Sequence, residues 1–198
     1  MINQRFLYLS GLLVAGGSLS YALDTLRGRV RPNRATWFMW ALAPLTAAFV
    51  QWRQHVGPLA GLTLVVGLGP AAVFATSFFN RGAYWKLRRL DFACLGASMS
   101  ALVMWVVFGE GVLALGLALA ADIFVAVPTT LKAIQFPASE SPGFYLGNAL
   151  GALVALLTLN ELTFLNSGFA AYVVIYCALM VMLIVRGRRS WSGGVVRH

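Results

Sequence analysis

The sequence predicts an all-α membrane protein: seven transmembrane helices in one domain, arranged as a parallel 3+1+3 repeat. Three observations lead to this prediction: the chain is very apolar, its apolar runs number seven, and its second half repeats the first at a fixed offset. Of the 198 residues, 60% are hydrophobic and 11% are charged, and the mean hydropathy is +0.78. Such a composition leaves too few polar groups to cover a water-exposed surface.

Apolar runs bounded by charges, proline or glycine define the seven expected spans, each of roughly the 20 residues that a bilayer requires. They cover residues 6–23, 36–52, 57–79, 91–109, 111–128, 143–160 and 163–185. Within residues 92–128, which cover most of span four and all of span five, only Gly109-Glu110-Gly111 interrupts the apolar sequence. One helix over residues 92–128 would extend about 55 Å, whereas the hydrocarbon core is about 30 Å thick. A hairpin is therefore expected at these three residues.

The basic residues predict the orientation in the membrane. All but Arg5 and Arg53 of the 15 Lys and Arg residues follow spans one, three, five or seven: Arg27, Arg29, Arg31, Arg34, Arg81, Lys86, Arg88, Arg89, Lys132, Arg186, Arg188, Arg189 and Arg197. Because positive residues are enriched on the cytoplasmic side, we expect an outside N-terminus and a cytoplasmic C-terminus. The net charge of +9 is then a topology signal, and no nucleic-acid partner is expected.

An internal repeat appears when the chain is shifted by 105 residues. Thr25-Leu26-Arg27 then aligns with Thr130-Leu131-Lys132, Pro32 aligns with Pro137, and Thr36 aligns with Ser141. Equivalent spans one and five are separated by an even number of crossings, so the two copies run parallel. We expect a first three-helix repeat over residues 1–80, a linker helix over 81–110, and a second repeat with a short basic tail over 111–198.

This pattern resembles the PQ-loop and SWEET superfamily of transporters. The local similarity lies in Pro128-Thr129-Thr130-Leu131-Lys132, followed by Pro137 and Ser139-Glu140-Ser141. The Pro-Gln dipeptide of that superfamily is Pro128-Thr129 in the second half and Leu23-Asp24 in the first. The chain is also similar to functionally unassigned bacterial seven-helix membrane proteins, through Pro32-Asn33-Arg34 and the aromatic segment that follows it. This similarity implies a bacterial inner membrane. The resemblance implies alternating access of a small polar solute between two three-helix halves.

Asp122 and Asn148 are the polar residues that the sequence singles out for binding a substrate or a proton. Asp122 lies six residues before Pro128, about 9 Å from the inner end of span five, and Asn148 lies at nearly the same depth in span six. A carboxylate inside a span costs roughly 2.5–3.5 kcal/mol, so it is expected to face the interior or a wet cavity and to have a partner. The alternative is a structural carboxylate, bonded to a neighbouring helix or lying near the interface.

Trp40 and Tyr145 occupy equivalent positions in the two halves and are expected to form the walls of the site, between spans one, two, five and six. Their alternative role, which applies more strongly to Trp37, is an interfacial aromatic belt.

Proline and glycine residues in the spans predict bending and close packing. Pro44, Pro70 and Pro128 are hinge candidates, although prolines are also simply common in membrane helices. Gly143, Gly147 and Gly151 recur every four residues, which predicts a close helix–helix contact.

The expected function is transport of a small polar solute such as a sugar or amino acid, either coupled to protons or uncoupled, with the lipid bilayer as the other partner. The alternatives are a non-transporting receptor or scaffold of the same fold, or an importer of a nucleoside-like vitamin. An enzyme is not expected, because no span carries a histidine or lysine to activate Ser98. His55 and His198 lack metal-ligand spacing, so no metal and no cofactor is expected. The sequence carries no signal for an oligomeric state.

Overall fold

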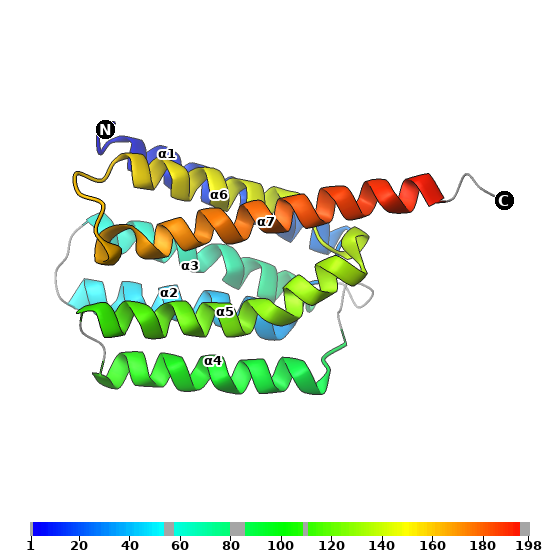
Figure 1. Ribbon diagram of the computed structural model, residues 1–198, viewed down its shortest axis with the longest axis horizontal. Coiled ribbons are helices and arrows are strands. Elements are labelled where there is room, and N and C mark those ends of the chain that lie inside the picture. Colours follow the sequence, from blue (N-terminus) through cyan, green and yellow to red (C-terminus); the bar gives the residue numbers. More distant parts are fainter. Residues whose placement is uncertain (1, 54–57, 80–85, 109–110, 195–198) are drawn as a thin grey trace.

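A computed structural model describes residues 2–53, 58–79, 86–108 and 111–194. In these segments the chain forms seven α-helices and one short 3₁₀ helix, and no strand (Figure 1). The helices are α1 (Phe6–Leu26), α2 (Arg34–Arg53), α3 (Pro58–Thr76), α4 (Arg89–Phe108), α5 (Gly111–Gln135), α6 (Pro142–Leu157) and α7 (Phe164–Gly194), and the 3₁₀ helix η1 (Pro137–Ser139) precedes α6.

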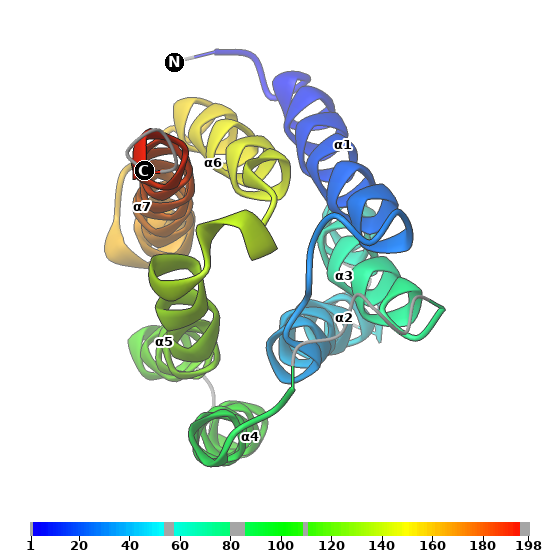
Figure 2. The same ribbon diagram turned by 90° about the vertical axis from the view of Figure 1, so that its right-hand side faces the viewer.

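The two halves have the same internal order. In each half the third helix lies between the other two: α3 contacts α1 and α2, and α7 contacts α5 and α6. Between the halves, α1 packs on α6 and α2 packs on α5, while α4 covers the outside of the α2–α5 contact. Figure 2 shows the resulting ring, in the order α1, α3, α2, α4, α5, α7, α6. Equivalent helices run in the same direction along the bundle (Figure 1).

Two hydrogen bonds at one end of the bundle are related by the 105-residue shift. The hydroxyl of Thr129 in α5 donates to the hydroxyl of Thr36 in α2 over 2.9 Å. The hydroxyl of Ser141, just before α6, donates to Asp24 in α1 over 2.8 Å. Shifting Thr36 and Thr129 to the equivalent positions in the other half gives Ser141 and Asp24. The contact between α2 and α5 is therefore the equivalent, under the internal repeat, of the contact between α6 and α1.

The helix that contains Asp122 extends beyond its expected end. We expected span five to stop at residue 128, but α5 continues through Pro128 to Gln135. Figure 1 shows that α5 changes direction in its C-terminal part. Proline lacks an N–H and clashes with the preceding turn, which bends a helix, and the hydroxyl of Thr36 donates to the carbonyl of Val125 in that turn over 3.0 Å. Lys132, which we placed in the loop after the span, is therefore a helical residue.

The remaining boundaries differ less, apart from the last helix. The expected break after span four is present, because α4 ends at Phe108 and α5 begins at Gly111. The other two residues of the expected hairpin, Gly109 and Glu110, lie outside the described residues. Helix α7 continues to Gly194 and not to residue 185, so Arg186, Arg188 and Arg189 are helical residues.

The outer surface of the bundle is strongly apolar. Large apolar side chains on different helices are more than 60% exposed, among them Leu12, Phe49 and Ile175. In the described part of the chain, two helical segments, Phe6–Leu26 and Asn166–Arg189, are long and apolar enough to cross a membrane. Shorter apolar helical stretches cover Thr63–Thr76 and Pro142–Leu157.

Helices α1 and α6 pack closely through glycine, as the four-residue spacing predicted. A Cβ atom added at Gly147 would lie 2.5 Å from the carbonyl oxygen of Leu13 and 2.9 Å from Cα of Gly17. Farther along the contact, Ser10 donates a hydrogen bond of 2.8 Å to the carbonyl of Gly151. The prediction of a close contact through Gly147 and Gly151 is confirmed.

Candidate binding cavity

A cavity of about 540 Å³ lies inside the bundle. Its size falls within the range of about 300–1,000 Å³ that is typical of small-molecule sites. It is lined by Met39, Trp40, Ala43, Pro44, Ala47, Thr63, Val66, Pro70, Ser98, Leu102, Ala121, Asp122, Val125, Phe144, Asn148, Phe169, Tyr172, Val173, Tyr176 and Cys177. These residues belong to six helices, α2 to α7.

The composition of the cavity wall corrects one expectation. We expected the site between spans one, two, five and six, but none of the lining residues comes from α1, and α3, α4 and α7 contribute instead. The reason is that α1 is held against α6 by the glycine contact, whereas α7 lies between α5 and α6 and faces the cavity along one side.

Asp122 lies on the cavity wall and has a partner. The hydroxyl of Tyr172 in α7 donates a hydrogen bond of 2.6 Å to one carboxylate oxygen of Asp122 in α5. The side chain of Asp122 is only partly buried, because it borders the cavity. The expectations of an interior position and of a hydrogen-bond partner agree with this geometry, while the role of Asp122 in binding remains a prediction.

Asn148 lines the same cavity from α6. Its amide nitrogen donates to the carbonyl of Phe144, one turn earlier in the same helix, over 2.9 Å. Among the described residues, this is the one hydrogen bond that the Asn148 side chain makes, so its amide oxygen can still accept a hydrogen bond. Ser98, another polar residue of the wall, donates its hydroxyl to the carbonyl of Ala121 over 2.7 Å.

Aromatic rings form two sides of the cavity. Trp40 of α2 stacks on Phe144 of α6 with ring centroids 5.9 Å apart. On α7, Phe169, Tyr172 and Tyr176 follow each other at 6.1 and 5.9 Å. We did not predict the α7 residues or Phe144. The available signal was the aromatic spacing of three and four residues in α7, which places the rings on one helix face.

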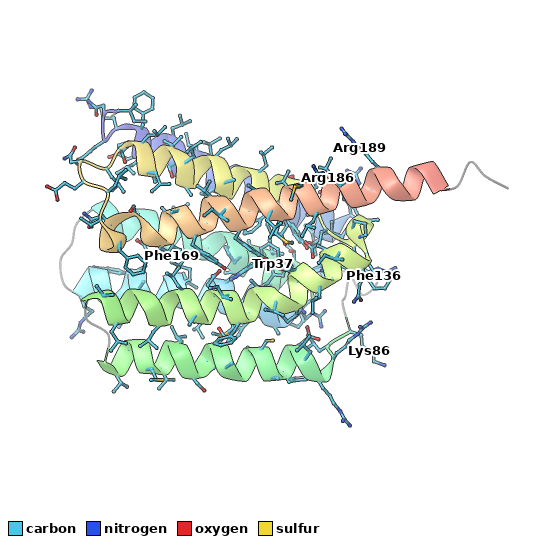
Figure 3. All side chains as sticks on the ribbon, in the orientation of Figure 1. Trp37, Lys86, Phe136, Phe169, Arg186 and Arg189 are labelled. Carbon is cyan, nitrogen blue, oxygen red and sulfur yellow. The ribbon has the colours of Figure 1, made fainter. Side chains whose placement is uncertain are left out.

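The two tryptophans near the start of α2 lie inside the bundle, so an interfacial belt does not explain them. Trp37 is buried against Tyr21 and Phe144, with ring centroids 4.5 and 4.6 Å away. Trp40 is also buried, and its ring lies 5.3 Å from that of Trp37. Figure 3 shows Trp37 in the middle of the bundle and Phe169 toward the end where α7 begins. The buried rings of Trp37 and Tyr21 pack beside Trp40, toward the start of α2, and form the closed side of the cavity.

Tyr145 belongs to this closed side and not to the cavity wall. Its ring centroid lies 6.4 Å from that of Trp40, but Tyr145 is absent from the lining residues. Its hydroxyl donates to Glu140 over 3.0 Å, and the hydroxyl of Tyr21 donates to the same carboxylate oxygen over 2.8 Å. The expected pairing of Trp40 with Tyr145 as two cavity walls is therefore not seen, because Tyr145 bonds Glu140 and does not line the cavity.

A buried ion pair completes the closed end. Lys132 of α5 and Glu140 are 2% and 0% exposed, and their side chains form a salt bridge. Lys132 also donates to the carbonyl of Arg31, which lies between α1 and α2. Arg188 of α7 donates to the carbonyl of Glu140. Sequence reasoning missed this pair because it placed Lys132 in the loop after span five.

The three hinge candidates all lie inside helices. Pro44 of α2 and Pro70 of α3 line the cavity, whereas Pro128 of α5 is buried but is not a lining residue. Each proline removes the N–H that would bond the carbonyl four residues earlier. For Pro44 and Pro70 these carbonyls belong to Trp40 and Val66, which are themselves lining residues.

Among the described residues, no three His, Cys, Asp or Glu side chains come together to hold a metal ion. His55 and His198 lie outside these residues. Comparison of the chain with protein-family models, curated proteins and solved structures yields no match.

Proposed function

We propose that this chain is a seven-span membrane transporter, similar to the PQ-loop and SWEET superfamily, that moves a small polar solute by alternating access. The observation that carries the proposal is a cavity with one carboxylate that is closed at one end by contacts between the two halves. Under the positive-inside rule, the N-terminus lies outside and the closed end faces the cytoplasm of a bacterial inner membrane.

The outer surface supports membrane insertion of the whole bundle. Helices of 20 residues, such as α2 and α4, extend about 30 Å, which matches the hydrocarbon core. Exposed apolar side chains on helices from both halves, including Leu12 and Ile175, are suited to lipid contact. The labelled basic residues Lys86, Arg186 and Arg189 lie toward the same end of the bundle (Figure 3).

The shared order of the two halves supports alternating access. Two units with the same helix order and direction, joined by a linking helix, are able to rock against each other around a central site. In the proposed mechanism, residues 1–80 and 111–198 form the two moving units, and α4, within residues 81–110, is the linker.

Contacts between the halves indicate what must break for the closed end to open. Tyr21 of the first half bonds Glu140 of the second, and Lys132 of the second bonds the Arg31 carbonyl of the first. The Thr36–Thr129 and Asp24–Ser141 bonds cross the same boundary. In the proposed cycle, solute enters from the outer side, these contacts break, and the helices bend at Pro44, Pro70 and Pro128.

Uptake into vesicles of phosphatidylethanolamine and phosphatidylglycerol tests the proposal, using the purified full chain and a panel of labelled sugars, amino acids and nucleosides. Uptake of at least one solute above protein-free vesicles is expected, with acceleration by a pH gradient if Asp122 carries the proton. Binding without uptake would identify a receptor and overturn transport. Uptake of nucleosides alone would favour the vitamin importer. An unchanged pH response in Asp122→Asn would exclude the proposed proton coupling.

A further inference from the structure

The cavity wall carries negative charge without positive charge among its described residues. Asp122 is its one acidic lining residue, and none of the described lining residues is basic. The two ion pairs found among the described residues, Arg29–Asp24 and Lys132–Glu140, lie elsewhere. Tyr172 occupies one carboxylate oxygen of Asp122, and no described residue bonds the other. A positive group in the cavity would therefore meet an uncompensated negative charge in apolar surroundings, where such attraction is strong.

Several other polar groups of the wall can accept a hydrogen bond from a ligand. The amide oxygen of Asn148 is one such acceptor, because the bond to Phe144 uses only the amide nitrogen. Pro44 and Pro70 remove the helix donors for the carbonyls of Trp40 and Val66. The hydroxyl of Ser98 already donates to the carbonyl of Ala121.

Aromatic faces surround the carboxylate. Tyr172, which bonds Asp122, stacks on Tyr176 at 5.9 Å, and Tyr176 in turn lies 6.0 Å from Trp40. A chain of rings thus leads from Asp122 across the cavity to α2. Aromatic faces attract organic cations, and rings gathered around a site are a known way to hold quaternary ammonium groups. Most of the other lining residues, such as Val66 and Leu102, are apolar.

We propose that this cavity recognises an organic cation: an ammonium group held between Asp122 and the aromatic rings, attached to an apolar or aromatic body that fills the rest of the space. This inference rests on the proposed function and specifies its substrate class. A sugar has hydroxyl groups that need several partners each, and the mostly apolar wall offers few. An anion would be repelled by Asp122.

Three small probes test the proposal with the full chain in detergent. Choline and 3,3-dimethylbutan-1-ol have the same shape, but carbon replaces the charged nitrogen in the second. Benzyltrimethylammonium keeps the charge and adds an aromatic body. Binding to the folded state alone raises the midpoint of thermal unfolding. We expect choline to bind at least tenfold more tightly than its neutral counterpart, and benzyltrimethylammonium more tightly than choline because it buries more apolar surface.

The variant Asp122→Asn keeps the shape of the side chain and an acceptor for Tyr172 while removing the charge. It should weaken binding of both cations at least tenfold and leave 3,3-dimethylbutan-1-ol unchanged. Glu161→Gln, which removes an exposed carboxylate between α6 and α7, is the matched control and should change neither. If Asp122→Asn fails to fold, the contrast between choline and its neutral counterpart on the native chain still decides the question.

The outcomes separate this inference from the proposed function. Equal binding of charged and neutral probes, or cation binding that survives Asp122→Asn, would overturn the cation site. If a neutral solute such as glucose binds and crosses vesicle membranes while the cations do not bind, the inference fails and transport stands. Cation binding that depends on Asp122, without uptake of any solute, would support the site and overturn transport.

Discussion

Lys132 and Glu140 form an ion pair that is enclosed at the end of the bundle where the two halves meet. Both residues come from the second half, but each also bonds the first: Glu140 accepts from Tyr21, and Lys132 donates to the carbonyl of Arg31. The pair therefore does more than neutralise two charges. It provides the second half with a rigid polar surface on which α1 and the segment before α2 dock.

Removing one member of this pair should destabilise the protein strongly. Lys132→Met leaves the Glu140 carboxylate buried without its cation, and loss of one partner of a buried pair typically costs about 3–5 kcal/mol. Adding Glu140→Gln should recover part of that loss, because no unpaired charge remains. The midpoint of thermal unfolding in detergent, measured for both single variants and the double variant, gives the coupling between the residues. Strictly additive effects would contradict the role of the pair.

A disulfide between positions 36 and 129 should lock the closed end. The hydroxyl oxygens of Thr36 and Thr129 are 2.9 Å apart, which places cysteine sulfur atoms at these positions within about 1 Å of the S–S bond length. In a background with Cys94 and Cys177 replaced by alanine, Thr36→Cys with Thr129→Cys should lose uptake on oxidation and regain it on reduction. Each single cysteine variant is the control. Full uptake by the cross-linked protein would show that this end does not open.

Glycine at position 147 should be essential to the contact between α1 and α6. An added Cβ would lie 2.5 Å from a backbone oxygen of α1, so the helices must separate, and Gly147→Ala should cost about 1–3 kcal/mol. Gly11→Ala, in α1, places its Cβ where no other group lies within 4 Å. That control should be neutral, or stabilising by up to about 1 kcal/mol through helix propensity. Equal unfolding midpoints for the two variants would refute the close contact.

Pro128 should affect the rate of transport more than stability. Replacing it by alanine restores a helix donor next to the carbonyl of Val125, which Thr36 bonds. Pro128→Ala is expected to be as stable as the native chain or more so, with slower uptake, because a straighter α5 bends less readily. Pro142→Ala is the control, since proline at the first turn of α6 replaces no helix hydrogen bond. Slower uptake by Pro142→Ala together with a native rate of uptake by Pro128→Ala would contradict the role of Pro128 as a hinge.

Membrane orientation can be checked with single cysteines at the two ends of the bundle. Leu162, between α6 and α7, is 75% exposed, and Leu162→Cys should react with a membrane-impermeant maleimide on intact cells. Lys86, before α4, is exposed at the opposite end, and Lys86→Cys should react only after permeabilisation. Labelling of both positions from the same side would exclude the proposed seven crossings.

Several features of this protein follow from the sequence alone because they depend on local composition. Uninterrupted apolar runs indicated seven helices, and seven are present in the described residues. The short break near Gly111 was visible because one helix over that stretch would be too long for a bilayer. The glycine spacing around Gly147 predicted a close contact, and Asp122 was conspicuous as a lone carboxylate in an apolar segment.

Only the tertiary structure decided which residues meet. The partner of Asp122 is Tyr172, fifty residues later, and Lys132 is buried because α5 continues through a proline. In these helices the face toward neighbouring helices and the face toward the outside are both apolar. The spacing of apolar residues along the sequence therefore does not show which face is which. The order of helices around the ring determines that α7, and not α1, borders the cavity. That order arises from packing between segments far apart in the chain, which local sequence patterns do not encode.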